Sequence, residues 1–290
     1  MNKLALGTAQ FGFKYGIANL EGKIKISEVN KILELAKYSN IDLIDTAISY
    51  GDSEKVIGNT EIKDFKFVSK LPALPKDCSD VNSWVDKQVQ SSLTRLGISS
   101  LYGLLVHRSE NLLGNSGKKL INALNSIKLN GLVKKIGISI YDPSECEQVM
   151  KFTRIDIVQA PLNIVDRRLV VSGLLTKLHS EEIEIHTRSA FLQGLLLLPS
   201  NKIPKSFNKW FKVWEKWSLE LKKNDLSAAE VCLLYPLSLP EVDRVIVGVD
   251  NTDQLIELIK RSKSQKPQID CSFMISNDQM LINPSNWSKL

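Results

Sequence analysis

An acid and a phenol stand close together near position 50, at the end of a short apolar run. Asp45 closes the run that begins at Leu43, and Tyr50 follows in the segment IDLIDTAISYG, residues 41–51. A strand here, preceded by an amphipathic helix over residues 27–39, would direct both side chains past its carboxyl end. Sites in α/β proteins are built at that edge. Asp45 and Tyr50 are therefore candidates for proton transfer.

Two more side chains suited to acid–base chemistry close the next two apolar runs. Lys70 ends the run FVSK, and His107 ends the run LLVH. A phenol has an ordinary pKa near 10, and a neighbouring ammonium lowers that pKa by stabilising the phenolate. We therefore expect Lys70 to lower the pKa of Tyr50, and Asp45 to pair with Lys70. His107 is expected to donate a hydrogen bond to a substrate oxygen.

Short apolar runs alternate with helical patterns along the whole chain, which is typical of βα units and a parallel sheet. The predicted strands are Lys3 to Gly7, Leu43 to Asp45, Lys66 to Lys70, Leu101 to Val106, Lys134 to Ile138, Ile155 to Gln159, Ile183 to Thr187 and Val245 to Val247. The predicted helices cover residues 27–39, 52–59, 80–96, 116–130, 142–150, 166–179, 206–223, 227–238 and 252–262.

Eight such units in 290 residues predict an α/β fold of the (β/α)8 TIM-barrel type, with residues 1–290 as a single domain. No linker rich in Pro, Gly or Ser divides the chain. A doubly wound sheet is the alternative, but it would require a glycine-rich first turn. The segment GTAQFG, residues 7–12, does not supply the GxGxxG pattern of that turn.

Composition narrows the classes of function. The net charge is +6, yet the lysines are scattered, which favours a solvated surface over a nucleic-acid partner. The four cysteines form no CxxC pair and the three histidines no His-x-His pair, which argues against a metal site. The apolar runs are too short for an export signal or a membrane span. We therefore expect a cytoplasmic protein that binds neither nucleic acid nor a membrane.

The motifs together resemble the aldo-keto reductase family, in the form found in bacteria. IDTAISYGDSE resembles the family's Asp-Thr-Ala-x-x-Tyr-Gly segment, VSKLP its lysine strand, and SSLTRLGISSLYGLLVHR the run that ends in its histidine. GISIYDPSE, VQAPLNIVDRR, SAFLQGLL and VIVGVDNTDQLIE resemble later family segments in the right order. The opening GTAQFGFKYGI is similar to members linked to surface-polysaccharide metabolism, which implies a carbonyl substrate that is sugar-derived.

The resemblance implies reversible hydride transfer between a nicotinamide cofactor and a carbonyl, without a metal. Tyr50 would protonate the developing alkoxide, with Lys70 and Asp45 behind it and His107 orienting the carbonyl. The family binds its dinucleotide extended across the barrel top, which fits the absence of a Rossmann fingerprint. By position, Ser139 and Gln159 would hold the carboxamide, Ser189, Phe191 and Gln193 would line the pyrophosphate, and Gly248, Gln254 and Glu257 would lie near the adenosine.

Three departures from the family pattern concern the cofactor. Ile140 stands where the family often has Asn on the carboxamide, and Arg188 replaces the aromatic residue that stacks on the nicotinamide, so we expect its flat guanidinium to stack there instead. Asp250 lies in the strand-eight segment, where members that select NADP carry Lys or Arg. The family default is NADP(H), but this segment predicts NAD(H) or dual use. If the protein binds NADP(H), Lys260 or Arg261 would have to supply the cation that pairs with the 2′-phosphate.

Other readings of the chain stay open. The sequence has no GxSxG motif, which argues against Ser-His-Asp hydrolysis. It also has no Tyr-x-x-x-Lys motif, which argues against short-chain dehydrogenase chemistry. Some proteins similar to the family are regulatory subunits that bind cofactor with little turnover. The aromatic residues between Phe207 and Trp217 recur at helical spacing, which favours core packing over a substrate lid. Trp287 either covers the barrel mouth or belongs to an exposed end.

Overall fold

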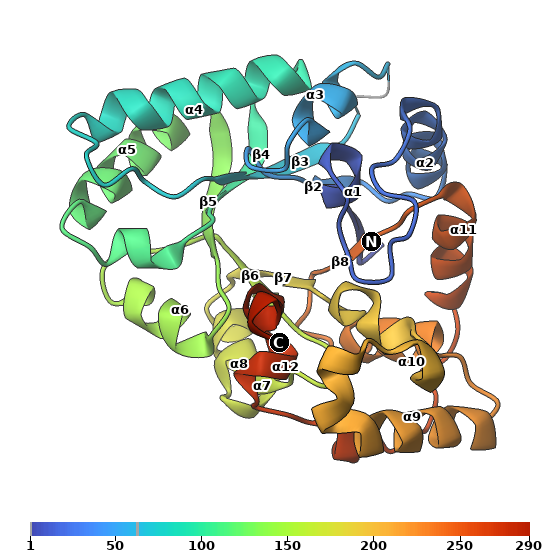
Figure 1. The fold of residues 1–290 in the computed structure, drawn as a ribbon. Coiled ribbons are helices and arrows are strands. Elements are labelled where there is room, and N and C mark those ends of the chain that lie inside the picture. The colour runs from blue at the N-terminus through green and yellow to red at the C-terminus, as the bar shows by residue number, and fades with distance from the viewer. Residues whose placement is uncertain (1, 62–63) are drawn as a thin grey trace.

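The computed structural model describes residues 2–61 and 64–290. Eight parallel strands close into a barrel in the order β1 to β8, with helices around it, as one domain (Figure 1). The strands are β1 (Leu4–Gly7), β2 (Leu43–Asp45), β3 (Lys66–Leu71), β4 (Leu101–Val106), β5 (Val133–Ser139), β6 (Ile157–Pro161), β7 (Glu184–Arg188) and β8 (Arg244–Gly248). The predicted (β/α)8 barrel is confirmed, and every predicted strand is present to within two residues at each end.

The predicted helices are present with two exceptions, and two short helices, Ala9–Gly12 and Gln279–Ile282, were not predicted. They are α1 (Ala9–Gly12), α2 (Ile26–Tyr38), α3 (Ser53–Gly58), α4 (Val81–Leu96), α5 (Gly117–Leu129), α6 (Pro143–Met150), α7 (Arg168–Val171), α8 (Leu174–Ser180), α9 (Phe211–Lys223), α10 (Ala228–Leu237), α11 (Thr252–Arg261) and α12 (Gln279–Ile282). The single helix predicted over 166–179 is wrong, because Gly173 adopts a left-handed φ of 77° between α7 and α8. The helix predicted over 206–223 begins as a 3-10 turn, η4 (Lys205–Trp210).

The interior of the barrel is filled by side chains, so the barrel is a core and not a channel. The inward-facing apolar residues are Ala5, Leu43, Val68, Leu105, Ile157 and Ile246. Gly103 leaves room for them, since a Cβ there would lie 2.7 Å from Ile157 Cδ1. A filled barrel confines any site to the loops at the strand ends.

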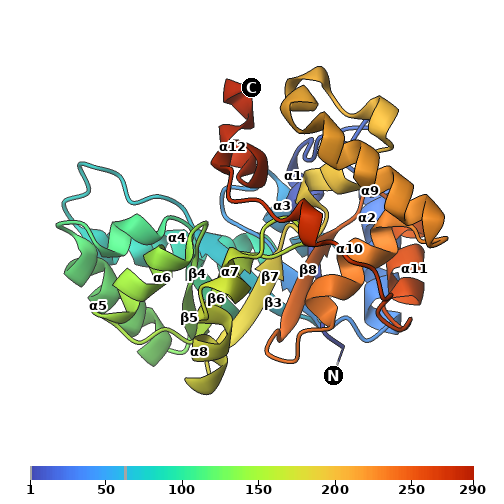
Figure 2. The ribbon, with the colours of Figure 1, turned by 90° about the horizontal axis from the view of Figure 1, so that it is seen from below.

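A second apolar cluster lies beside the barrel and contains the aromatic residues after β7. Phe207, Trp210, Trp214 and Trp217 are buried, as core packing predicts, whereas Phe211 is 48% exposed. The ring of Trp287 meets that of Phe207 edge-on at 5.0 Å, so Trp287 packs on this cluster. In Figure 2, α12 and the carboxyl terminus lie on the side of the barrel opposite the amino terminus. In the described part of the chain, no helix has both the length and the apolar character that crossing a membrane requires.

Candidate active site

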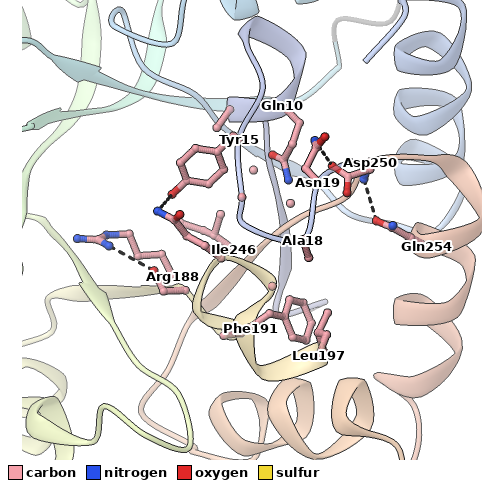
Figure 3. A pocket seen from close by; sticks show the side chains of 18 of the residues that line it. Gln10, Tyr15, Ala18, Asn19, Arg188, Phe191, Leu197, Ile246, Asp250 and Gln254 are labelled. Atoms are coloured by element: carbon pink, nitrogen blue, oxygen red, sulfur yellow. Dashed lines mark hydrogen bonds between the residues drawn. The ribbon is translucent and has the colours of Figure 1, made fainter. Parts of the chain in front are cut away.

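A cavity of about 490 Å³ opens at the carboxyl ends of the strands, a volume common for sites that take small molecules or cofactors (Figure 3). The loops after β1, β2, β7 and β8 and the start of α10 line it. Asp45 and Tyr50 belong to its wall, whereas Lys70 and His107 lie next to the wall.

Asp45 and Lys70 form a buried ion pair behind the cavity. Lys70 Nζ donates to Asp45 Oδ1 at 2.6 Å and to the Thr46 carbonyl at 2.9 Å. Both side chains are almost wholly shielded from solvent because they close adjacent strands, β2 and β3. Burial lowers the pKa of Lys70, and the charge of Asp45 opposes this shift. The structure thus brings together the pair that the sequence predicted.

Tyr50 lies over this pair, with Lys70 Nζ 5.0 Å from the centre of its ring. Gly12 lets the loop after β1 pack against the backbone of Tyr50, because a Cβ at this position would lie 1.7 Å from the Tyr50 carbonyl oxygen. Burial raises the pKa of Tyr50 above its usual value, and the charge of Asp45 raises it further. The pKa of this phenol is therefore not lowered overall, because burial and the charge of Asp45 outweigh the effect of the Lys70 ammonium. Tyr50 stays protonated, which suits a proton donor.

His107 follows β4 and meets the Tyr50 ring edge-on, with the ring centres 6.1 Å apart. Its Nδ1 lies 3.4 Å from the Ser49 hydroxyl. Burial, together with the charges of Lys70 and Arg188, lowers the pKa of His107 to about 3. The imidazole is therefore neutral near pH 7 and can donate a hydrogen bond without carrying charge.

Gln159, on β6, belongs to the cavity lining and has a buried side-chain oxygen without a partner among the described residues. Its Nε2 donates to Asp45 Oδ2 at 2.7 Å, while its buried Oε1 has no partner among the described residues. A buried carbonyl without a partner is costly, so an amide N–H of a ligand would satisfy it. This orphaned acceptor fits a nicotinamide carboxamide. Ser139 is paired with Gln159 in the sheet register and is buried, but it does not line the cavity.

The middle of the cavity lies between the loops after β1 and β7. This part of the cavity is lined by Ser189, Phe191 and Gln193, the residues that the family resemblance places along the pyrophosphate. Gln193 Nε2 donates to the Tyr15 hydroxyl at 3.2 Å, which joins the two loops (Figure 3). The backbone of Ser189 and Gln193 is left-handed, with φ of 63° and 54°. Sequence reasoning missed Tyr15, because it lies in a loop and closes no strand.

The far end of the cavity contains Gly248, Asp250, Gln254 and Glu257. Asn19 donates to Asp250 Oδ1 at 2.8 Å, and Gln254 Oε1 accepts from the Asp250 amide at 2.8 Å (Figure 3). Burial raises the pKa of Asp250. Asn19 was also missed from sequence, because it reaches this end along the first loop.

Arg261, one of the cations that the sequence offered for a 2′-phosphate, is held by acids. It pairs with Glu257 at 2.6 Å and with Glu230 at 3.2 Å. A phosphate would have to compete with both carboxylates for this guanidinium.

The family model described as "Aldo/keto reductase family" matches residues 3–272. The chain belongs to the aldo/keto reductase family. It is 24% identical over 289 residues to the uncharacterized oxidoreductase YqkF of Bacillus subtilis (strain 168), covering 92% of each protein. It is 23% identical over 288 residues to the NADH-specific methylglyoxal reductase of Escherichia coli (strain K12), covering 85% of this chain and 86% of the relative.

Solved structures of other aldo/keto reductases share the fold. The holo form of aldo-keto reductase AKR11C1 from Bacillus halodurans has a TM-score of 0.72 at 17% identity, covering 92% of this chain and 88% of that chain. The glycerol dehydrogenase AKR11B4 from Gluconobacter oxydans has a TM-score of 0.70 at 18% identity, with the same coverage. At such identities the likeness shows the barrel alone.

Proposed function

We propose that this aldo/keto reductase, with residues 1–290 acting as one domain, is an NAD(P)H-dependent enzyme that reduces an aldehyde or ketone to an alcohol. A sugar-derived carbonyl is one substrate of this class. The observation that carries the proposal is the protonated Tyr50 beside the buried Asp45–Lys70 pair, at a cavity where Gln159 offers an orphaned acceptor. Family membership supports the reaction class.

The chain's residues divide the work between binding and proton transfer. A bound nicotinamide cofactor would supply the hydride. Gln159 Oε1 would accept from the carboxamide, with Ser139 next to it. Ser189, Phe191 and Gln193 would hold the pyrophosphate, and Gly248, Gln254 and Glu257 would hold the adenosine end.

Tyr50 and the residues around it carry out the proton transfer. Tyr50 Oη donates its proton to the oxygen of the substrate as negative charge develops there. Neutral His107 donates a hydrogen bond to the same oxygen and orients the carbonyl. Lys70, which Asp45 holds in place, lies at the Tyr50 ring and stabilises the phenolate that remains.

The enzyme assay follows from this proposal. Purified protein is mixed with NADH or NADPH and a panel of neutral and charged aldehydes, and loss of the reduced cofactor is followed by absorbance. We expect steady turnover with at least one aldehyde. Tight cofactor binding without turnover on any aldehyde would instead favour a regulatory, cofactor-binding role.

The preference between cofactors is expected to be small. Asp250 faces the adenosine end and Arg261 is engaged by two acids, so a 2′-phosphate lacks the charge-assisted hydrogen bonds that normally contribute about 1.5–3 kcal/mol each. The NADH-specific relative from E. coli also supports NAD(H) or dual use. We predict that Kd for NADPH is at most about tenfold below that for NADH, a difference of ~1.4 kcal/mol.

Fluorescence titration of both cofactors at one salt concentration measures this preference. Asp250→Asn removes the repelling charge and is expected to shift binding towards NADPH. A preference for NADPH above about a hundredfold in the unmodified protein contradicts the prediction. Loss of that preference in Arg261→Ala would then identify the cation responsible.

The rate of carbonyl reduction is expected to show no histidine titration between about pH 5 and about pH 8. An unperturbed imidazole gains its proton near pH 6.5, but the pKa of His107 is lowered to about 3, so it stays neutral throughout this window. The raised pKa of Tyr50 keeps the phenol protonated there as well. A kcat for reduction that falls about tenfold between pH 7 and pH 5, with folding intact, would contradict the assigned state of His107.

A further inference from the structure

Arg188, the last residue of β7, brings a guanidinium to the end of the cavity opposite Asp250 and Gln254 (Figure 3). Its Nη2 donates to the Ile140 carbonyl at 3.0 Å, and its Cζ lies 4.4 Å from the centre of the Tyr141 ring. These contacts come from the loop after β5, and Nη1 of Arg188 also lies 3.4 Å from the hydroxyl of the adjacent Ser189. The predicted stacking on the nicotinamide is not favoured, because the guanidinium already lies over Tyr141.

The charge of Arg188 acts on the residues that would do the chemistry. Burial is the main cause of the shifts at Tyr50 and His107, but the guanidinium lowers the pKa of both groups. Arg188 and Tyr50 also line the same cavity, and His107 contacts the Tyr50 ring, so the cation can meet a substituent of a substrate whose carbonyl contacts these two side chains.

Arg188 has no acidic partner among the described residues 2–61 and 64–290. The nearby carboxylate of Asp45 is occupied by Lys70 and Gln159. By contrast, Arg95 and Arg168, which are also partly buried, each pair with a carboxylate. A partly buried cation without a counter-ion is costly, and a guanidinium has five N–H donors, of which Arg188 uses one at 3.0 Å and one at 3.4 Å.

We propose that Arg188 binds an anionic substituent of the substrate, so that the preferred substrates are carbonyl compounds that carry a carboxylate or a phosphate. This inference rests on the proposed function, since it names the substrate class of the same site. The planar guanidinium presents paired N–H donors that match both anions. Arg188 is then the residue that selects the substrate, while Tyr50 and His107 act on its carbonyl.

Two pairs of probes test the charge, the first at nearly constant shape. The first pair is para-carboxybenzaldehyde and its methyl ester, and the second is glyceraldehyde phosphate and glyceraldehyde. We expect kcat/KM to favour the anion by at least about tenfold in one pair, and Arg188→Leu to remove that preference. Arg188→Lys should retain part of it. Whichever pair shows the larger preference identifies carboxylate or phosphate as the natural group.

Arg108→Leu is the matched control, because Arg108 is an exposed cation next to His107 that does not line the cavity. It should change the preference by less than about twofold. Cofactor Kd, measured by fluorescence, should be unaltered in Arg188→Leu. Equal losses with the anion and its neutral partner, or a weakened cofactor Kd of similar size, would overturn the proposal.

Binding without turnover separates this proposal from the proposed function. Calorimetric titration of benzoate and of inorganic phosphate into the cofactor-saturated protein should detect one of these anions, and Arg188→Leu should abolish its binding. If the protein reduces no carbonyl yet loses anion binding in this variant, the anion site holds and the proposed function fails. If the unmodified protein binds neither anion and prefers neither charged aldehyde, the Arg188 proposal fails.

Discussion

Replacing Tyr50 by phenylalanine is expected to leave cofactor binding intact and to lower kcat for carbonyl reduction by about 10²- to 10⁴-fold, the range typical of general acid catalysis. The change removes the transferable proton and keeps the ring. That ring still meets Phe13 at 6.0 Å and His107 at 6.1 Å, and Lys70 still lies beneath it. Steady-state assays with NADH and the best aldehyde measure kcat, and fluorescence titration measures cofactor Kd.

Tyr235→Phe is the matched control for Tyr50→Phe. It makes the same chemical change at a partly buried tyrosine that does not line the cavity, so kcat should stay near that of the unmodified protein. If Tyr50→Phe retains more than about a tenth of kcat, the phenol contributes less than ~1.4 kcal/mol and is not the proton donor.

Replacing Lys70 by methionine is expected to cost both stability and activity. The substitution leaves the Asp45 carboxylate buried without its cation, and breaking a buried ion pair in this way typically costs about 3–5 kcal/mol. The uncompensated charge of Asp45 should also raise the pKa of Tyr50 further. Alcohol oxidation, in which the phenolate acts as base, would then need a higher pH. Urea denaturation and a pH–rate profile for oxidation measure the two effects.

The double variant Asp45→Asn with Lys70→Met separates stability from chemistry. It removes both charges, so the free energy of unfolding should largely recover, while the rate stays low because no ammonium stabilises the phenolate. A pH–rate profile of Lys70→Met that matches the unmodified protein would exclude the coupling between Lys70 and Tyr50.

The barrel could be predicted from the sequence because each buried strand is a short apolar run between helical patterns. The interruption at Gly173 was missed, since one left-handed residue breaks a helix without changing its apolar spacing. The 3-10 helix η4, which precedes α9, was also missed because the apolar spacing does not distinguish it from an α-helix. Phe207 and Trp210 are three residues apart, a spacing that both kinds of helix place on one face.

The side chains of the candidate site were predictable where they close a strand. Asp45 and Lys70 end apolar runs, and the closed barrel brings those ends together. Tyr15 and Asn19 lie in a loop whose path no local pattern determines, so their contacts with Gln193 and Asp250 could not be foreseen. The direction of the pKa shift at Tyr50 could not be predicted because it depends on burial, which spacing does not give.

The most direct test of the account follows the transferred hydrogen itself. The protein is incubated with an aldehyde and with reduced cofactor that carries deuterium at both positions of the nicotinamide C4, and the alcohol is examined by mass spectrometry and NMR. We expect an alcohol with one deuterium on the former carbonyl carbon, formed by the unmodified protein and far more slowly by Tyr50→Phe. An alcohol without deuterium at that carbon, or no alcohol while both cofactors bind, would contradict it.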